Sequence, residues 1–320
     1  MGLAALDRTV SELVEQGLSP ATATVYRSGW KRYLHFCGRF SLTPLPASEY
    51  HLCAFAAHLS DAVSWQTIRS YLCAVRFYHI RNNLPDPSNV SMPKLAYVLK
   101  GVHKRTPEYQ RPTRHPVTAD VLRRIHYLWY KTPITFNTTL LWAAFCLGFF
   151  GFLRPGEFTF APNFPHSGLT VADVAIDSRD NPRVLIVFIR TSKTDQFSKG
   201  THLYLGRTEG SLCPVSSMLA YLALRPPTPG PLFIFQDGTP LSRGQLTAHL
   251  RAALCNVGLQ STRFSGHSFR IGAASTAGFS DSFIQKLGRW KSSAFTRYIR
   301  TPQSQLIESS ATLANTSVLD

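Results

Sequence analysis

The sequence predicts a mainly α-helical protein with one small antiparallel β-sheet, built as two domains. Most of its 320 residues fall in segments whose apolar positions recur at helical spacing behind a capping residue. Between residues 169 and 205, short runs of β-branched residues are separated by turn residues, which is typical of strands. Residues 104–117 hold three prolines and five basic residues without any periodicity, which indicates an extended linker. We therefore expect domains at 1–103 and 118–320.

The charge of the chain indicates an anionic partner. Its formal net charge is +16, and basic residues outnumber acidic ones both before and after residue 115. Nucleic acid is the first partner to expect for such a chain. Because both parts of the chain are basic, we expect them to bind the nucleic acid from two sides. A hydrophobic content of 44% with 16% charged residues is typical of a globular protein and not of a disordered one.

The cysteines and the apolar runs exclude several classes of protein. No two of the six cysteines form a C-x-x-C pair, which argues against a zinc site and for a reducing, intracellular compartment. The longest apolar run, residues 140–153, is too short to span a bilayer. Asp7 and Arg8 interrupt the N-terminus, so no signal peptide is expected.

Four helices are expected in the N-terminal domain. The first begins at Ser19 and Pro20, because serine caps helices and proline is favoured at their first position. The other three are expected at about 48–59, 64–82 and 94–104. The third of these four helices should turn four apolar residues inward: Ile68, Leu72, Val75 and Ile80.

Basic side chains lie on the outer faces of these helices. They include Arg27, Lys31, Arg69 and Arg76, the last two seven apart and therefore on one face. By composition alone, DNA contact and simple solvation explain such faces equally well.

The C-terminal domain should combine helices with three strands. Thr118 caps a helix to about Tyr130, and a buried helix follows at 135–153, ended by Pro155 because proline disfavours helical geometry at the residue before it. Strands are expected at 169–177, 184–189 and 201–205, and helices at 214–224 and 242–257.

The last organised stretch, residues 266–300, gathers the side chains that carry chemistry. His267 and Arg270 share one face of the first turn of a helix expected at 268–277. An arginine is unfavourable at this positive end of the helix dipole unless an anion binds there. A second short helix, 281–287, is expected between Ser280 and Gly288, and a third after Trp290.

The third helix carries Tyr298 between Arg297 and Arg300. Any one of these aromatic or histidine residues alone would more often be part of a core. Together they suit a phosphodiester.

The order H-x-x-R, G-R-W, Y-I-R resembles the C-terminal motif of the tyrosine recombinase, or phage integrase, family. Within the family it is similar to Cre recombinase and to the recombinases of DIRS-type and Crypton-type eukaryotic mobile elements. The resemblance implies a site-specific DNA recombinase with an N-terminal helical core-binding (SAM-like) DNA-binding domain and a catalytic domain. Such an enzyme cuts and rejoins double-stranded DNA through a covalent 3′-phosphotyrosine, for integration or excision of a mobile element.

The resemblance also implies the assembly, the location and the cofactors. We expect a homotetramer on DNA, two dimers in synapsis, and a nuclear protein like the recombinases of eukaryotic elements. No metal or other cofactor is expected, because arginines supply the positive charge.

The family pattern assigns six catalytic residues in this chain: Arg154, Lys193, His267, Arg270, Trp290 and Tyr298. It implies that Tyr298 is the nucleophile, that the two arginines clamp the non-bridging oxygens, and that His267 is the general base. It further implies that Lys193 protonates the leaving 5′ oxygen and that the Trp290 indole N–H binds the phosphate.

Two assignments keep an alternative. Taken alone, F-L-R-P-G-E predicts an ion pair between Arg154 and Glu157; with the resemblance, Arg154 binds phosphate and Glu157 orients it. In R-T-S-K-T the catalytic lysine is Lys193, with Lys199 as the nearby alternative, and a lysine in a hairpin turn is more often a solvated edge residue.

Four further basic residues near the site are expected to contact DNA: Arg190, Lys199, Arg289 and Arg297. Three departures from the family pattern stand out, the first being one residue inserted before Lys193 in R-T-S-K-T. Ile271 replaces the second histidine of the bacterial motif, and Trp290 lies eight residues before Tyr298, one fewer than is usual in bacterial members.

Two other functions fit the same residues. A type IB topoisomerase uses similar chemistry and would relax plasmids without a specific site. A domesticated DNA-binding protein would keep the fold without cleavage, although such proteins usually lose an arginine or the tyrosine, and both arginines and Tyr298 are present here.

Overall fold

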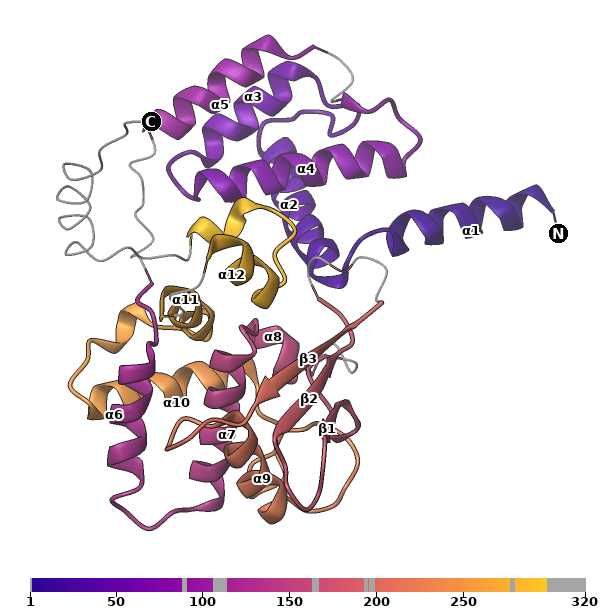
Figure 1. Cartoon of the computed structure of the whole chain (residues 1–320). Helices are drawn as coiled ribbons and strands as arrows, with labels where there is room; N and C mark the ends of the chain where they lie inside the picture. Colours follow the sequence, from indigo (N-terminus) through magenta and orange to yellow (C-terminus); the bar gives the residue numbers. More distant parts are fainter. Residues whose placement is uncertain are drawn as a thin grey trace, which may run out of the picture. The chain divides into compact units, whose positions relative to one another are not determined.

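The computed structural model describes residues 2–87, 91–105, 114–162, 167–192, 195, 199–276 and 280–297. The chain divides into two compact units, Met1–Arg111 and Pro112–Asp320. Figure 1 shows that the first is wholly helical and that the second adds a small sheet, as the sequence predicts.

The first unit consists of α1 (Leu3–Gln16), α2 (Pro20–Arg39), α3 (Glu49–Leu59), α4 (Trp65–Arg81) and α5 (Pro93–Arg105). The side chains of Ser19, Ser48 and Ser64 cap α2, α3 and α4 by accepting a backbone N–H from three residues on. Helix α2 packs on α4, and α3 packs on α5. The four predicted helices are therefore confirmed, whereas α1, which buries no side chain, was not expected.

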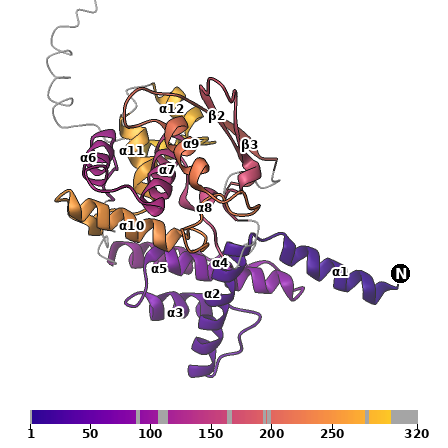
Figure 2. The ribbon, with the colours of Figure 1, turned by 90° about the horizontal axis from the view of Figure 1, so that it is seen from below.

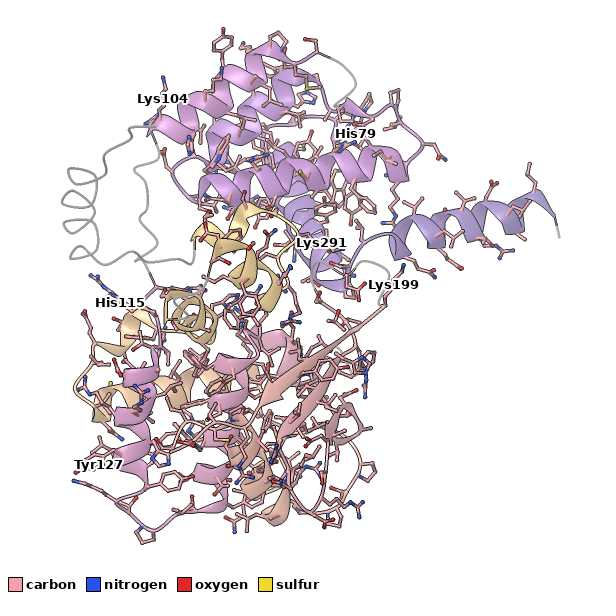
Figure 3. The ribbon with its side chains drawn as sticks, in the orientation of Figure 1. His79, Lys104, His115, Tyr127, Lys199 and Lys291 are labelled. Carbon is pink, nitrogen blue, oxygen red and sulfur yellow. The ribbon has the colours of Figure 1, made fainter. Side chains whose placement is uncertain are left out.

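The inward face of α4 corrects one expectation. Ile68 and Val75 are fully buried, but Ile80 is 42% exposed and His79 is buried instead. Position 79 lies four residues after 75, on the same helix face, whereas position 80 is turned away from it. His79 Nε2 accepts the Ala47 N–H at 2.8 Å and its Nδ1 donates to the Val75 carbonyl at 2.9 Å (Figure 3).

The second unit is organised around α7 (Phe136–Phe150), which Figure 2 shows at its middle. The elements around it are α6 (Ala119–Trp129), α8 (Pro155–Phe158), α9 (Pro214–Leu224), α10 (Arg243–Asn256), α11 (His267–Thr276) and α12 (Asp281–Leu287). Helix α7 is apolar on every side because it packs against α9 on one side and α11 on another. It ends at Gly151, before the expected end at 153, and Phe152 then takes a left-handed φ of 49°.

The sheet is antiparallel in the order β1 (Val174–Ile176), β2 (Val184–Ile189), β3 (Thr201–Gly206). Val187 of β2 pairs with Val174 on one side and with Leu203 on the other. Alternate residues of β2, Leu185, Val187 and Ile189, enter the core with α7 and α9.

Strand β1 is shorter than the sequence predicts. The 3₁₀ turn η2 (Val171–Asp173) takes the first half of the expected strand. The Asp173 carboxylate holds this turn by accepting the backbone N–H and the hydroxyl of Thr170 at 2.7 and 2.9 Å. The local alternation of apolar residues does not report such a capping interaction.

The residues of the expected linker divide between the two units. Lys104 and Arg105 continue α5, whose negative C-terminal end favours basic side chains. The backbone N–H groups of His115 and Val117 bond to the carbonyls of Arg263 and Ser268, each at 2.9 Å, so this end is fastened to the second unit. Residues 106–113 lie outside the described part, and the linker there stays a prediction.

Candidate phosphodiester site

Arg154 and Glu157 form the ion pair that the sequence predicts for them. Arg154 precedes Pro155 and takes an extended conformation, with φ −75° and ψ 142°, so its backbone N–H is not used by a helix. Glu157 accepts that N–H at 2.9 Å on one oxygen and the Arg154 Nη1 at 2.8 Å on the other. One carboxylate thus fixes both the backbone and the guanidinium of Arg154.

The same carboxylate binds a second guanidinium. Arg289 Nη2 donates to Glu157 Oε2 at 2.9 Å, from a position 132 residues further along the chain. The Glu157 side chain is only 4% exposed. Burial works to raise the pKa of its carboxyl, but the charges of Arg289 and Arg154 and the Arg154 N–H outweigh burial and lower the pKa. Glu157 therefore stays ionised and holds the two arginines beside each other.

Arg270 joins the loops that carry those two arginines. It lies in α11, is 1% exposed, and donates from Nη1 to the Phe152 carbonyl at 2.5 Å and from Nη2 to the Gly288 carbonyl. Phe152 lies two residues before Arg154, and Gly288 immediately precedes Arg289. Its guanidinium carbon is 4.0 Å from the centroid of the Trp290 ring, which supports the guanidinium plane. Arg154, Arg270 and Arg289 are thereby assembled from three separate segments.

His267 begins α11 within the field of four arginines. Burial is the largest cause that lowers the pKa of its imidazole, and the charges of Arg114, Arg243, Arg270 and Arg154 add to it, giving a pKa of about 4. The imidazole is therefore neutral at pH 7 and able to accept a proton. Its Nδ1 is buried and has no hydrogen-bond partner among the described residues.

The structure thus brings together Arg154, Glu157, His267, Arg270 and Trp290 of the predicted site. Lys193 and Tyr298 lie outside the described residues, and so does the side chain of Arg297. Their predicted roles are not tested by the geometry. Lys199 is exposed near the tip of the hairpin between β2 and β3 (Figure 3).

Two arginines near the site were missed in the sequence. Arg243 occupies the first position of α10, and Arg114 precedes the segment that hydrogen-bonds to the loop before α11 and to Ser268 within it. The signal for Arg243 is the one that marks Arg270, an arginine at the positive end of a helix dipole. Nothing in the sequence singles out Arg114 from the other basic residues around it, because only the fold places it near His267.

Several known proteins are similar to this chain in sequence or in fold. No family model matches the sequence. An integrase/recombinase XerD homolog of Selenomonas ruminantium is 22% identical over 274 residues, which cover 82% of this chain and 75% of that protein. Among solved structures, the XerH site-specific recombinase bound to difH has a TM-score of 0.63 at 14% identity, with 92% of this chain and 80% of that one covered. The Tn1549 transposon integrase bound to transposon right end DNA has a TM-score of 0.57 at 12% identity, with 90% and 93% covered.

The chain has the tyrosine recombinase fold. The sequence match spans both units, and the fold is that of the two solved recombinases. Among the described residues, no helix is both long and apolar enough to cross a membrane.

The basic residues outside the site differ in how they are held. Arg27, Lys31 and Arg69 are exposed on α2 and α4. Arg76 instead pairs with Asp86 through three hydrogen bonds of 2.6 to 2.9 Å. Arg190 forms an ion pair with the buried Asp173 at 2.7 Å, so it also fastens β2 to η2.

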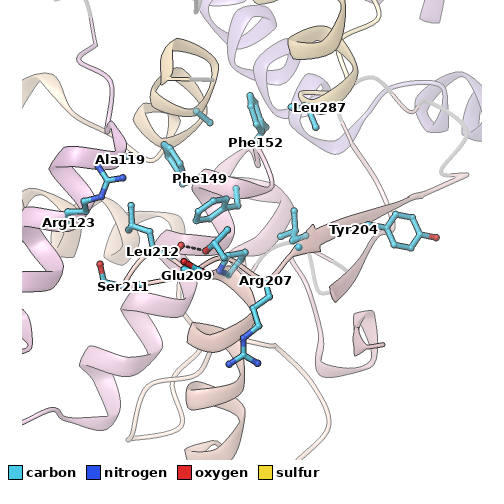
Figure 4. Close-up of a pocket in the computed structure, with 17 residues that line it drawn as sticks. Ala119, Arg123, Phe149, Phe152, Tyr204, Arg207, Glu209, Ser211, Leu212 and Leu287 are labelled. Carbon is cyan, nitrogen blue, oxygen red and sulfur yellow. Dashed lines mark hydrogen bonds between the residues drawn. The ribbon is translucent and has the colours of Figure 1, made fainter. Parts of the chain in front are cut away.

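A separate pocket of about 720 Å³ lies on the second unit between α6, the end of α7 and the loop after β3 (Figure 4). Phe149, Phe152, Leu212 and Leu287 are among its lining residues. None of the predicted catalytic side chains lines this pocket, and its mostly apolar walls do not suit a phosphate group.

Proposed function

We propose that this protein is a site-specific DNA recombinase that cuts and rejoins double-stranded DNA through a 3′-phosphotyrosine intermediate. The observation that carries the proposal is the meeting of Arg154, Arg270 and a neutral His267 in one place. Three separate segments converge there on a positively charged centre, and Glu157 is the acidic side chain that pairs with its arginines. The negative charge and the oxygen acceptors of a phosphodiester match the arginines of this centre.

In the proposed reaction the Tyr298 hydroxyl attacks the phosphorus and the bond from phosphorus to the 5′ oxygen breaks. The phenol proton passes to His267, whose low pKa in the free protein leaves it unprotonated and ready to accept. Arg154 and Arg270 stabilise the charge that develops on the non-bridging oxygens.

Lys193, or Lys199 in its place, donates a proton to the departing 5′ oxygen. The phosphotyrosyl bond keeps the energy of the broken strand, so a 5′ hydroxyl from another strand reverses the steps without a nucleotide cofactor.

The proposed role in the cell rests on the similar proteins and on the motif at residues 266–300. Integrase/recombinase and transposon integrase are the names of the similar proteins, which supports a part in the integration or excision of a mobile element. We propose that the active form is a homotetramer of two dimers on DNA. The likeness of the 266–300 motif to recombinases of eukaryotic elements supports a nuclear location.

The test of this function is trapping of the covalent intermediate. The substrate is a pool of random-sequence duplexes, each with a nick. Where the nick lies close to the cleaved bond, the short fragment with the 5′ hydroxyl dissociates after attack. Without this fragment the strand cannot be rejoined, so the protein stays covalently bound. We expect an adduct that survives denaturing electrophoresis in the wild-type protein and is absent from Tyr298→Phe. Sequencing the trapped DNA gives the site.

Each other outcome of this test has a meaning. An adduct in Tyr298→Phe would show that another residue is the nucleophile. Relaxation of supercoiled plasmid without a preferred sequence would favour a type IB topoisomerase. DNA binding without any adduct from the wild-type protein would favour a DNA-binding protein that has lost cleavage.

A further inference from the structure

Arg289 is held in an unusual way at the end of α12. Its backbone φ is 56°, in the left-handed region that residues other than glycine rarely adopt. Its side chain is 14% exposed, and Nη2 donates to Glu157. Its Nε and Nη1 atoms are shielded from solvent and have no hydrogen-bond partner among the described residues. The guanidinium of Arg289 thus has two donors at the site that no described residue uses.

Unused buried donors on a charged group are costly. Leaving one such donor without a partner destabilises a protein, and more so when the group is charged. Native proteins contain few of them, so each one needs an explanation. Here Arg154 and Arg289 share one carboxylate, Glu157, and Arg270 bonds to the backbone beside them, so the described site carries an excess of positive charge. An anion with several oxygen acceptors would satisfy both the donors and the charge.

Trp290 has a different place in the same structure. Its side chain is 8% exposed, packs edge-on against Phe152 and lies under the guanidinium of Arg270. The ring also covers Gly288 so closely that a Cβ there would come within 1.5 Å of it. The ring is therefore fixed by packing, and what it does in the described site is support Arg270.

The spacing to the nucleophile agrees with this division of roles. Trp290 precedes Tyr298 by one residue fewer than is usual in bacterial members of the family, whereas Arg289 has the usual separation. The two positions are therefore not equivalent in the family pattern.

We propose that Arg289, and not Trp290, is the third side chain that binds the phosphate group, with Glu157 as the positioning residue that holds Arg289 and Arg154 side by side. The inference rests on the proposed function for its substrate. Trp290 then acts through Arg270.

The first test uses inorganic phosphate and the full-length protein without DNA. The reporter is the His267 ring signal in NMR titrations, assigned by its loss in His267→Gln, because phosphate bound at the site should raise the pKa of His267. In Arg289→Gln we expect the phosphate concentration for half of this rise to increase about 10- to 100-fold, since a charge-assisted bond is lost. Arg179→Gln, which alters an exposed arginine of the turn between β1 and β2, should match the wild-type protein.

A second pair of variants separates phosphate binding from simple balance of the Glu157 charge. Glu157→Gln removes the carboxylate, and the double variant with Arg289→Gln then lacks both partners without leaving a buried charge. If the double variant binds phosphate as tightly as Glu157→Gln alone, Arg289 serves only to neutralise Glu157 and the inference is wrong. A further loss of about 10-fold or more in the double variant supports it. This comparison decides the question even if Arg289→Gln alone does not fold.

The DNA assay distinguishes failure of the inference from failure of the proposed function. On trapped DNA, we expect Arg289→Gln to slow formation of the adduct about 100-fold or more. The double variant of Arg289→Gln with Glu157→Gln should have the melting temperature of Glu157→Gln alone. Unchanged phosphate affinity and an unchanged adduct rate would overturn the role of Arg289 and leave recombination intact. If the wild-type protein forms no adduct, and Arg289→Gln loses the phosphate binding of the wild-type protein, the proposed cleavage is wrong and the anion site stands.

Discussion

At the scale of single residues, Arg270 and Glu157 organise the site in complementary ways. Arg270 uses backbone carbonyls to fasten the loops that precede Arg154 and Arg289. Glu157 uses its carboxylate to hold the guanidiniums of both arginines. Sequence reasoning could pair Glu157 with Arg154, three residues away, because the two share one turn. The contact with Arg289 depends on the fold alone.

His267 makes the stability of the protein depend on pH. Its pKa is about 4 in the folded protein and about 6.5 in an unfolded chain, so the unfolded state binds more protons between those values. Stability is therefore lost as the pH falls from 6.5 towards 4, by about 2–3 kcal/mol between pH 7.5 and 4.5. Urea unfolding of the wild-type protein and of His267→Gln at these two pH values measures the effect.

The difference between the two proteins isolates the contribution of His267, because all other titrating groups are common to both. We expect the unfolding free energy of His267→Gln, relative to that of the wild-type protein, to be higher at pH 4.5 than at pH 7.5. A difference in unfolding free energy that stays constant from pH 7.5 to 4.5 would show that the imidazole is not held neutral.

At the scale of elements, α11 is placed by the chain that enters the second unit. Val117 donates its N–H to the Ser268 carbonyl, and Gly272 lies directly against the Val117 backbone. This contact fixes the helix that carries His267 and Arg270. The helix ends of this unit were predictable because their caps are local, whereas the contact between residues 117 and 272 is not marked in the sequence.

Gly272→Ala should therefore destabilise the protein. A Cβ at this position would lie 1.8 Å from the Val117 carbonyl oxygen, which forces the two segments apart. We expect a loss of about 1–3 kcal/mol in unfolding free energy, as for other overpacked sites, and a loss of adduct formation. Gly101→Ala in α5 is the matched control, because its Cβ meets nothing within 4 Å, and it should be neutral or stabilising by about 0.5–1 kcal/mol. Equal melting temperatures of the two variants would contradict this view of α11.

At the scale of the whole molecule, the net charge of +16 should govern affinity for DNA. Each phosphate contact releases counterions, so affinity falls as salt rises. Basic residues outnumber acidic ones in both parts of the chain, so the positive charge is not confined to one basic tail. How these residues are held decides which of them are available to DNA.

Arg27 and Arg190 should respond differently to the same substitution. Arg27 is exposed on α2, and Arg27→Gln should lower the slope of log affinity against log salt by about 1 without loss of stability. Arg190→Gln leaves the buried Asp173 without its ion pair, so we expect a lower melting temperature and a smaller change in slope. Salt titrations of binding to a generic duplex, with thermal unfolding of the same samples, check both. The opposite pattern would mean that Arg190 is a principal DNA contact.

The sequence by itself determined the helices other than α1 and α8, the strand β2, the ion pair of Arg154 with Glu157 and the order of the recombinase motif. These depend on caps, periodicity and neighbours within one or two turns, which act locally. Only the tertiary structure decided that Glu157 also binds Arg289, that Trp290 supports Arg270 and that His79 replaces Ile80 in the core. Such contacts join segments far apart in the chain, or depend on what a neighbouring segment leaves room for, and no local pattern encodes them.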